Sequence, residues 1–188
     1  MIINSGFEVA QPVDKVWSFF DDIPRVAACL PGASLSDDLG GGRYKGGVAI
    51  RMGPVRLQFA GNAEIVSRDD AGKKIVVNAT GADEKGRGNA AMTVTAALSP
   101  AGGRGTKVDV IQDLQLSGAA AQYGRGMIAD FSAIMMRDFS ANMAASISGE
   151  SISGGSPVGG FGLALRAGRL ALARVFRRFF LPYQGVPA

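Results

Sequence analysis

The sequence predicts an α+β fold in which a curved antiparallel sheet of about seven strands wraps around one long C-terminal helix. Three observations support this prediction. Strand-length segments follow one another from residue 33 to residue 117, separated by short turn-forming sequences. A helical repeat of hydrophobic residues follows over 120–146. The 188 residues include 27 glycines and 8 prolines, a content that is high for a helical bundle and typical of a turn-rich sheet.

The N-terminal part predicts one strand and two short helices. Residues 2–11 are expected to form the opening strand, because hydrophobic and charged residues alternate there. Pro12, at an early helical position, begins a short helix, and the segment Asp21–Pro24 ends it. A second short helix is expected over 24–30, where a Leu-Pro-Gly turn ends it.

Six further strands are predicted, each bounded by turns rich in glycine, proline or aspartate. Connections of this length join antiparallel neighbours, so the strands form a meander. The expected strands span residues 33–38, 43–52, 55–68, 73–82, 87–99 and 105–117.

The segment 120–146 predicts one long amphipathic helix, because methionine and phenylalanine recur there every four residues. The strands that would face it are rich in glycine and alanine, and small wall residues beside adaptable methionines suit an apolar pocket. Ordinary core packing explains any single residue of the stripe equally well. The stripe consists of Met127, Phe131, Met135, Phe139 and Met143.

The glycine- and serine-rich composition of residues 147–160 predicts a flexible linker. Residues 161–188 are predicted to form an amphipathic tail. The net charge of +4 belongs to the C-terminal end, since 151–188 holds five arginines and no acidic residue. Spanning a bilayer is disfavoured, because each arginine costs about 2.5–3.5 kcal/mol near its centre. We expect the tail to lie on an anionic membrane surface, the alternatives being a partner groove or the protein's own body. The expected membrane-binding residues are Phe161, Leu165, Arg166, Arg169, Leu172, Arg174, Phe176, Arg177, Arg178 and Phe179.

The composition excludes several kinds of catalytic site. Without histidine, the chain has no Ser-His-Asp triad, no Cys–His pair and no imidazole metal ligand. Cys29, the single cysteine, forms neither an internal disulfide nor a thiolate cluster. The adjacent acidic pairs lie in predicted turns, where solvated carboxylates are usual, and Asp138 lies at the edge of the helical stripe. We therefore expect no catalytic residue and no metal site.

An apolar cavity beside a membrane-binding tail predicts a lipid-like ligand. The N-terminus carries no signal-peptide pattern, and residues 1–150 carry no basic face for nucleic acid. The expected ligand-binding residues are Phe7, Leu30, Met52, Phe59, Val77, Met92, Val94, Val110, Leu114, Met127, Phe131 and Met135.

Five short motifs in residues 1–146 resemble the CoxG family of carbon monoxide dehydrogenase subunits, within the START-type helix-grip superfamily. The Leu-Pro-Gly and Gly-Pro-Val turns are specific when taken together. The motifs are Phe7-Glu8-Val9, Pro12–Trp17, Cys29-Leu30-Pro31-Gly32, Met52-Gly53-Pro54-Val55 and Tyr123–Met127.

This resemblance implies a helix-grip fold with a large apolar cavity and an accessory role for a molybdenum-containing carbon monoxide dehydrogenase. It also implies handling of a quinone, with menaquinone as the expected cargo, and attachment of the enzyme to the inner face of the cytoplasmic membrane. It carries over no catalytic residue. Three hypotheses follow: a quinone carrier, an adaptor that only recruits the dehydrogenase to the membrane, and an enzyme related to polyketide cyclases. We expect the first.

Overall fold

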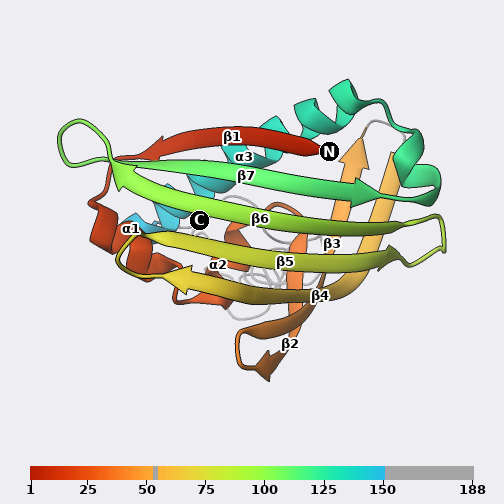
Figure 1. Cartoon of the computed structure of the whole chain (residues 1–188), viewed down its shortest axis with the longest axis horizontal. Helices are drawn as coiled ribbons and strands as arrows, with labels where there is room; N and C mark the ends of the chain where they lie inside the picture. The colour runs from red at the N-terminus through yellow and green to blue at the C-terminus, as the bar shows by residue number, and fades with distance from the viewer. Residues whose placement is uncertain (53–54, 151–188) are drawn as a thin grey trace, which may run out of the picture. The chain divides into compact units, whose positions relative to one another are not determined.

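A computed structural model of the protein describes residues 1–52 and 55–150 (Figure 1). Within these residues the chain forms a strand, two short helices, six more strands, a short 3-10 helix and a long helix, in that order. The predicted α+β architecture is therefore confirmed, and each predicted strand ends within two residues of an observed one.

The seven described strands form one antiparallel sheet in the order β1-β7-β6-β5-β4-β3-β2. Consecutive strands from β2 to β7 are neighbours, as a meander requires, and the N-terminal strand β1 closes the sheet beside β7. The strands are β1 (Ile2–Val9), β2 (Ala33–Gly40), β3 (Arg43–Met52), β4 (Val55–Asp69), β5 (Lys74–Asp83), β6 (Asn89–Pro100) and β7 (Thr106–Leu116).

The helices occupy one side of this sheet, and α3 runs behind it in Figure 1. They are α1 (Val13–Phe19), α2 (Ile23–Cys29), the 3-10 helix η1 (Gly118–Gln122) and α3 (Arg125–Ser148). The prediction of one helix over 120–146 was wrong at its start, because Tyr123 and Gly124 have extended backbone angles that separate η1 from α3. At its other end α3 takes in the first two residues of the predicted linker.

A line of glycines bends the sheet. Gly46 of β3 pairs with Gly61 of β4, and Gly61 pairs with Gly81 of β5. A Cβ atom on Gly61 would overlap the carbonyl oxygen of Thr80, so only glycine allows the strands to approach this closely. Figure 1 shows the result: β4 begins alongside the steep β3 and then bends into line with β5. The sheet curves around α3 because side chains are missing along this line.

Hydrophobic side chains pack in two clusters at opposite ends of the strands. The larger cluster joins α1, α2 and the C-terminal half of α3 to the sheet and includes Trp17, Phe19 and Met143. The smaller one, around Leu57 and Phe59, packs at the other end, beside η1. The middle of the concave face between the two clusters faces α3.

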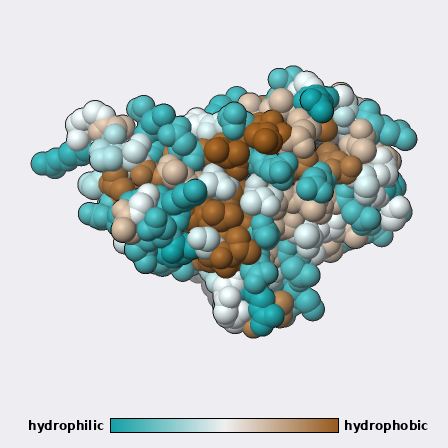
Figure 2. Space-filling view, in the orientation of Figure 1, coloured by the Kyte–Doolittle hydropathy of each residue, from teal (hydrophilic) through white to brown (hydrophobic). Residues whose placement is uncertain are grey.

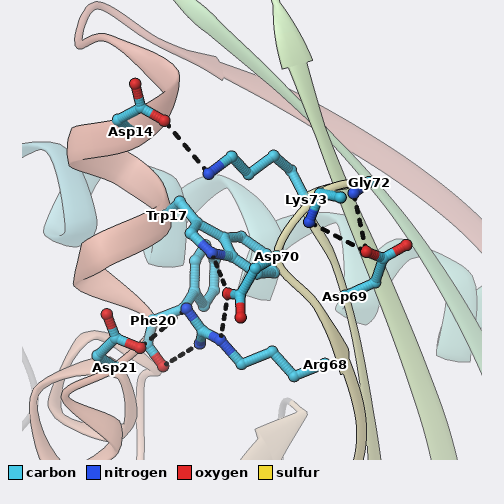
Figure 3. Close-up of polar contacts among 10 residues, drawn as sticks. Asp14, Trp17, Phe20, Asp21, Arg68, Asp69, Asp70, Gly72 and Lys73 are labelled. Carbon is cyan, nitrogen blue, oxygen red and sulfur yellow. Dashed lines mark hydrogen bonds and ion pairs between the residues drawn. The ribbon is translucent and has the colours of Figure 1, made fainter.

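Polar contacts fix α1 to the turn between β4 and β5 (Figure 3). Arg68 lies over the Trp17 ring, 4.2 Å from its centroid, and pairs with Asp21 at 2.8 Å. Lys73 lies on the same ring and pairs with Asp14 at 3.2 Å. The only tryptophan of the chain is thereby held between two cations.

The C-terminal segment 151–188 lies outside the described residues, and so do most of the predicted linker and all ten predicted membrane-binding residues. None of the helices in the described ranges combines the length and the apolar character that a membrane span needs.

Candidate functional site: an apolar cavity under α3

A cavity of about 490 Å³ lies between the concave face of the sheet and the helices. Its walls are contributed by all seven strands and by α2, η1 and α3, and most of the lining side chains are hydrophobic. Phe7 and Phe139, which both line it, contact each other edge to face, with ring centroids 5.9 Å apart. A volume of this size is within the range of small-molecule sites, which are mostly apolar with a few placed polar groups.

The structure brings together ten of the twelve residues that the sequence predicts for ligand binding. Five strands, the helix α3 and the residue that follows α2 contribute them, and all of them line the same cavity. The ten residues in the lining are Phe7, Leu30, Phe59, Val77, Met92, Val94, Val110, Leu114, Phe131 and Met135.

The two other predicted residues are not among those in the lining. Met127 was placed wrongly: it lies in the first turn of α3, is 51% exposed and is not among the residues that line the cavity. A strict four-residue spacing advances by about 40° at each step, so Met127 and the fully buried Met143 point about 160° apart. Met52 lies in β3, and its side chain is outside the described part of the molecule.

The inward face of α3 follows the mixed three- and four-residue spacing of a helix packed on a sheet. The residues of this face that line the cavity are Ile128, Phe131, Ser132, Met135, Met136 and Phe139. This face includes a serine, which a search for hydrophobic residues alone passes over.

The cavity contains one buried polar pair, and sequence reasoning missed it. Ser132 Oγ donates a hydrogen bond to Gln112 Oε1 at 3.0 Å, and both residues are 7% exposed. Gln112 stands in the inward row of β7 between Val110 and Leu114. That alternation was visible in the sequence, and a glutamine at an inward position of an apolar strand was the signal.

Other polar groups lie toward the edge of the cavity. Tyr44 of β3 is half-buried in the lining, and burial raises the pKa of its hydroxyl, with the nearby Asp38 adding to the effect. The phenol therefore stays protonated. Among the described residues, Glu64 is the only acidic residue of the lining, and its side chain is exposed.

Asp83, Asp138 and Cys29 lie outside the cavity lining. Asp83 is buried, but Arg87 donates to both of its oxygens at 2.8 Å, and this interaction holds the pKa of the carboxyl well below its usual range. Asp138 pairs with Arg137 at 3.0 Å on the exposed side of α3. Burial raises the pKa of the Cys29 thiol, which makes it a poor nucleophile. Residues 1–52 and 55–150 hold no cluster of three or more potential metal ligands.

The outer face of the sheet contrasts with the cavity. Figure 2 shows hydrophobic side chains there in separate groups among hydrophilic ones. Val66 and Ile111, which are 47% and 48% exposed, are two of the hydrophobic residues at this surface. This face of the sheet therefore carries separate hydrophobic groups, whereas the lining of the cavity under α3 is mostly hydrophobic.

Comparison with known proteins gives one family match. Residues 6–148 match the model of the CoxG family, whose description is that of a carbon monoxide dehydrogenase subunit. The matched segment includes all ten predicted residues that line the cavity. No protein with a curated description matches the chain.

Solved structures match at low sequence identity. A conserved protein from Geobacillus kaustophilus is 20% identical, with a TM-score of 0.71 over 79% of this chain and 96% of that chain. A protein from Thermus thermophilus is 13% identical, with a TM-score of 0.56 over 78% of this chain and 99% of that one. The ZhuI aromatase/cyclase from Streptomyces sp. R1128 is 13% identical, with a TM-score of 0.51 over 79% and 92%. These likenesses confirm the predicted helix-grip fold and carry no function.

Proposed function

The chain belongs to the CoxG family of carbon monoxide dehydrogenase subunits, and we propose that it carries a quinone in the cavity under α3. Members of this family are accessory subunits associated with carbon monoxide dehydrogenase. In the proposal, the protein takes a quinone, with menaquinone as the first candidate, between a molybdenum-containing dehydrogenase and the membrane quinone pool.

The observation that supports the proposal is the cavity itself. A largely apolar space of about 490 Å³, partly open at the surface, is costly to maintain, because its lining lacks the dispersion contacts of a packed core. A protein that only recruited a partner would gain stability by filling it. Phe131, Met135 and Met92 offer the flexible and aromatic surface that suits a flat ring system with an apolar chain.

Membrane contact is the second part of the proposal, and it rests on the sequence of the tail. The five arginines of 161–188 are expected to meet anionic headgroups, at about 1 kcal/mol each, while its phenylalanines and leucines enter the interface. The tail would then bring the cavity to the membrane, where the quinone is exchanged.

The experiment is gentle purification of the full-length protein from its own host, followed by solvent extraction and mass spectrometry for quinones and lipids. We expect one quinone for each protein molecule, and the mass of its side chain would name it. If the cavity holds no quinone and the protein still binds membranes and the dehydrogenase, the carrier hypothesis fails. The protein would then be an adaptor that only recruits the dehydrogenase to the membrane. A different lipid in stoichiometric amount would keep the carrier and change its cargo.

A further inference from the structure

The side-chain amide of Gln112 is half satisfied. Its oxygen accepts from Ser132, whereas Nε2 is buried without a hydrogen-bond partner among the described residues 1–52 and 55–150. The side chain is more than nine-tenths buried and belongs to the cavity lining. A buried amide donor that is left unpaired costs about 1–3 kcal/mol.

The surroundings of Gln112 offer few alternatives to a ligand. Its neighbours along the inward row of β7 are Val110 and Leu114, and its cross-strand partners are Ile3 on β1 and Val94 on β6. All four side chains are aliphatic, and all four line the cavity. Within the cavity lining, the amide nitrogen therefore has no polar neighbour at these four positions.

Ser132 contacts the oxygen end of this amide. Its hydroxyl, on the inward face of α3, donates a hydrogen bond to Oε1 across the gap between helix and sheet. Because the oxygen is engaged, the N–H groups of Nε2 are the part of the amide that is left to bind a ligand. Ser5, diagonal to Gln112 across β1 and β7, also has a buried hydroxyl without a partner among the described residues, but it lies outside the cavity lining.

We propose that Gln112 Nε2 donates a hydrogen bond to a carbonyl oxygen of the cavity ligand and that Ser132 positions it. This inference rests on the proposed function and adds the chemistry of recognition. The ligand is a mainly apolar molecule that presents a hydrogen-bond acceptor at this point of the wall, as a quinone does. A pure hydrocarbon of the same shape would leave the amide unpaired and bind more weakly.

The test combines one change in the protein with one change in the probe. The full-length protein, Gln112→Leu and Gln115→Leu are titrated by calorimetry with 2-methyl-1,4-naphthoquinone and with 2-methylnaphthalene, which lacks both carbonyls. Gln115→Leu is the matched control, because it makes the same change on the exposed face of β7. Gln112→Met serves as a second variant of similar volume, and the thermal midpoint of each variant checks its fold.

We expect Gln112→Leu and Gln112→Met to weaken binding of the naphthoquinone by about tenfold. Binding of methylnaphthalene should change by less than about twofold, because apolar contacts are retained. Ser132→Ala should give a smaller loss, again for the quinone alone. Gln115→Leu should bind both probes as the unchanged protein does.

Two outcomes overturn the inference while leaving the proposed function standing. Equal losses for both probes would make Gln112 a structural residue, and unchanged quinone affinity in the Gln112 variants would show that the amide makes no contact. If the unchanged protein binds neither probe, the proposed cavity function fails, and the inference fails with it.

Discussion

Trp17 Nε1 donates a hydrogen bond to Asp70 Oδ1 at 2.8 Å, although the two residues are 53 positions apart in the sequence. This bond joins α1 to the turn between β4 and β5 (Figure 3). Trp17 belongs to the larger hydrophobic cluster, and Asp70 binds the polar edge of its ring. The carboxylate also accepts from Arg68 at 3.1 Å. Asp70 therefore joins Arg68 and Lys73 in holding α1 against the sheet.

Replacing Trp17 by phenylalanine should lower the free energy of unfolding by about 1–2 kcal/mol, from the lost hydrogen bond and the smaller ring. Urea unfolding followed by circular dichroism measures it, since the variant has no tryptophan fluorescence. Asp70→Asn is the milder comparison, because an amide oxygen still accepts from the indole. A Trp17→Phe variant as stable as the original chain would show that this contact contributes nothing.

Asp83→Asn should destabilise the protein at neutral pH, with an effect that fades in acid. Hydrogen bonds from Arg87 hold the pKa of Asp83 below its ordinary value. The ionised carboxylate therefore makes its full contribution to the free energy of unfolding at any pH above that ordinary value. It is lost as the pH falls toward the lowered pKa, because the unfolded chain takes up the proton first. Urea midpoints at neutral pH and at about pH 3 measure the difference. Glu84→Gln, next along the chain and exposed, should show no such trend, and a pH-independent loss in Asp83→Asn would contradict the assignment.

Gly61→Ala should cost about 1–3 kcal/mol of stability, because the new methyl group meets the backbone of β5. The matched control is Gly126→Ala in the first turn of α3, where a Cβ meets nothing and alanine favours the helix. Thermal unfolding of both variants provides the measurement. Equal midpoints would mean that the glycine line does not set the curvature of the sheet.

Phe131→Glu should empty the cavity of quinone, whereas Met127→Glu should leave occupancy unchanged. The two residues are one helical turn apart on α3, but Phe131 lines the cavity, whereas Met127 is half-exposed and outside the lining. A carboxylate in an apolar cavity has no partner to compensate its lost hydration. Mass spectrometry of the extracted proteins gives the occupancy. Equal retention by the two variants would place the ligand elsewhere.

Deleting residues 161–188 should abolish binding to phosphatidylglycerol vesicles and preserve quinone binding in detergent. Sedimentation with the vesicles measures the first effect, and calorimetry the second. Neutral phosphatidylcholine vesicles are the control, because the arginines find no anionic headgroup there. Loss of quinone binding in a folded deletion variant would show that the tail is part of the ligand site.

The sequence alone predicted the order of the strands and helices and most of the residues that line the cavity. Alternation in the strands fixes which side chains face inward, since a strand has a period of two, and Val77, Val94 and Leu114 follow it without exception. Turn residues mark strand ends reliably, which is why the strand bounds agree closely.

The fold decided what a one-dimensional pattern leaves open. A repeat of four residues drifts around a helix, so only the packing of α3 selects which part of the stripe faces the sheet, and Met127 turns outward. The pairing of Gln112 with Ser132 joins two elements whose contact no local pattern encodes. Local sequence determines backbone conformation through nearest neighbours, whereas the polar point of the cavity exists only once helix and sheet have packed together.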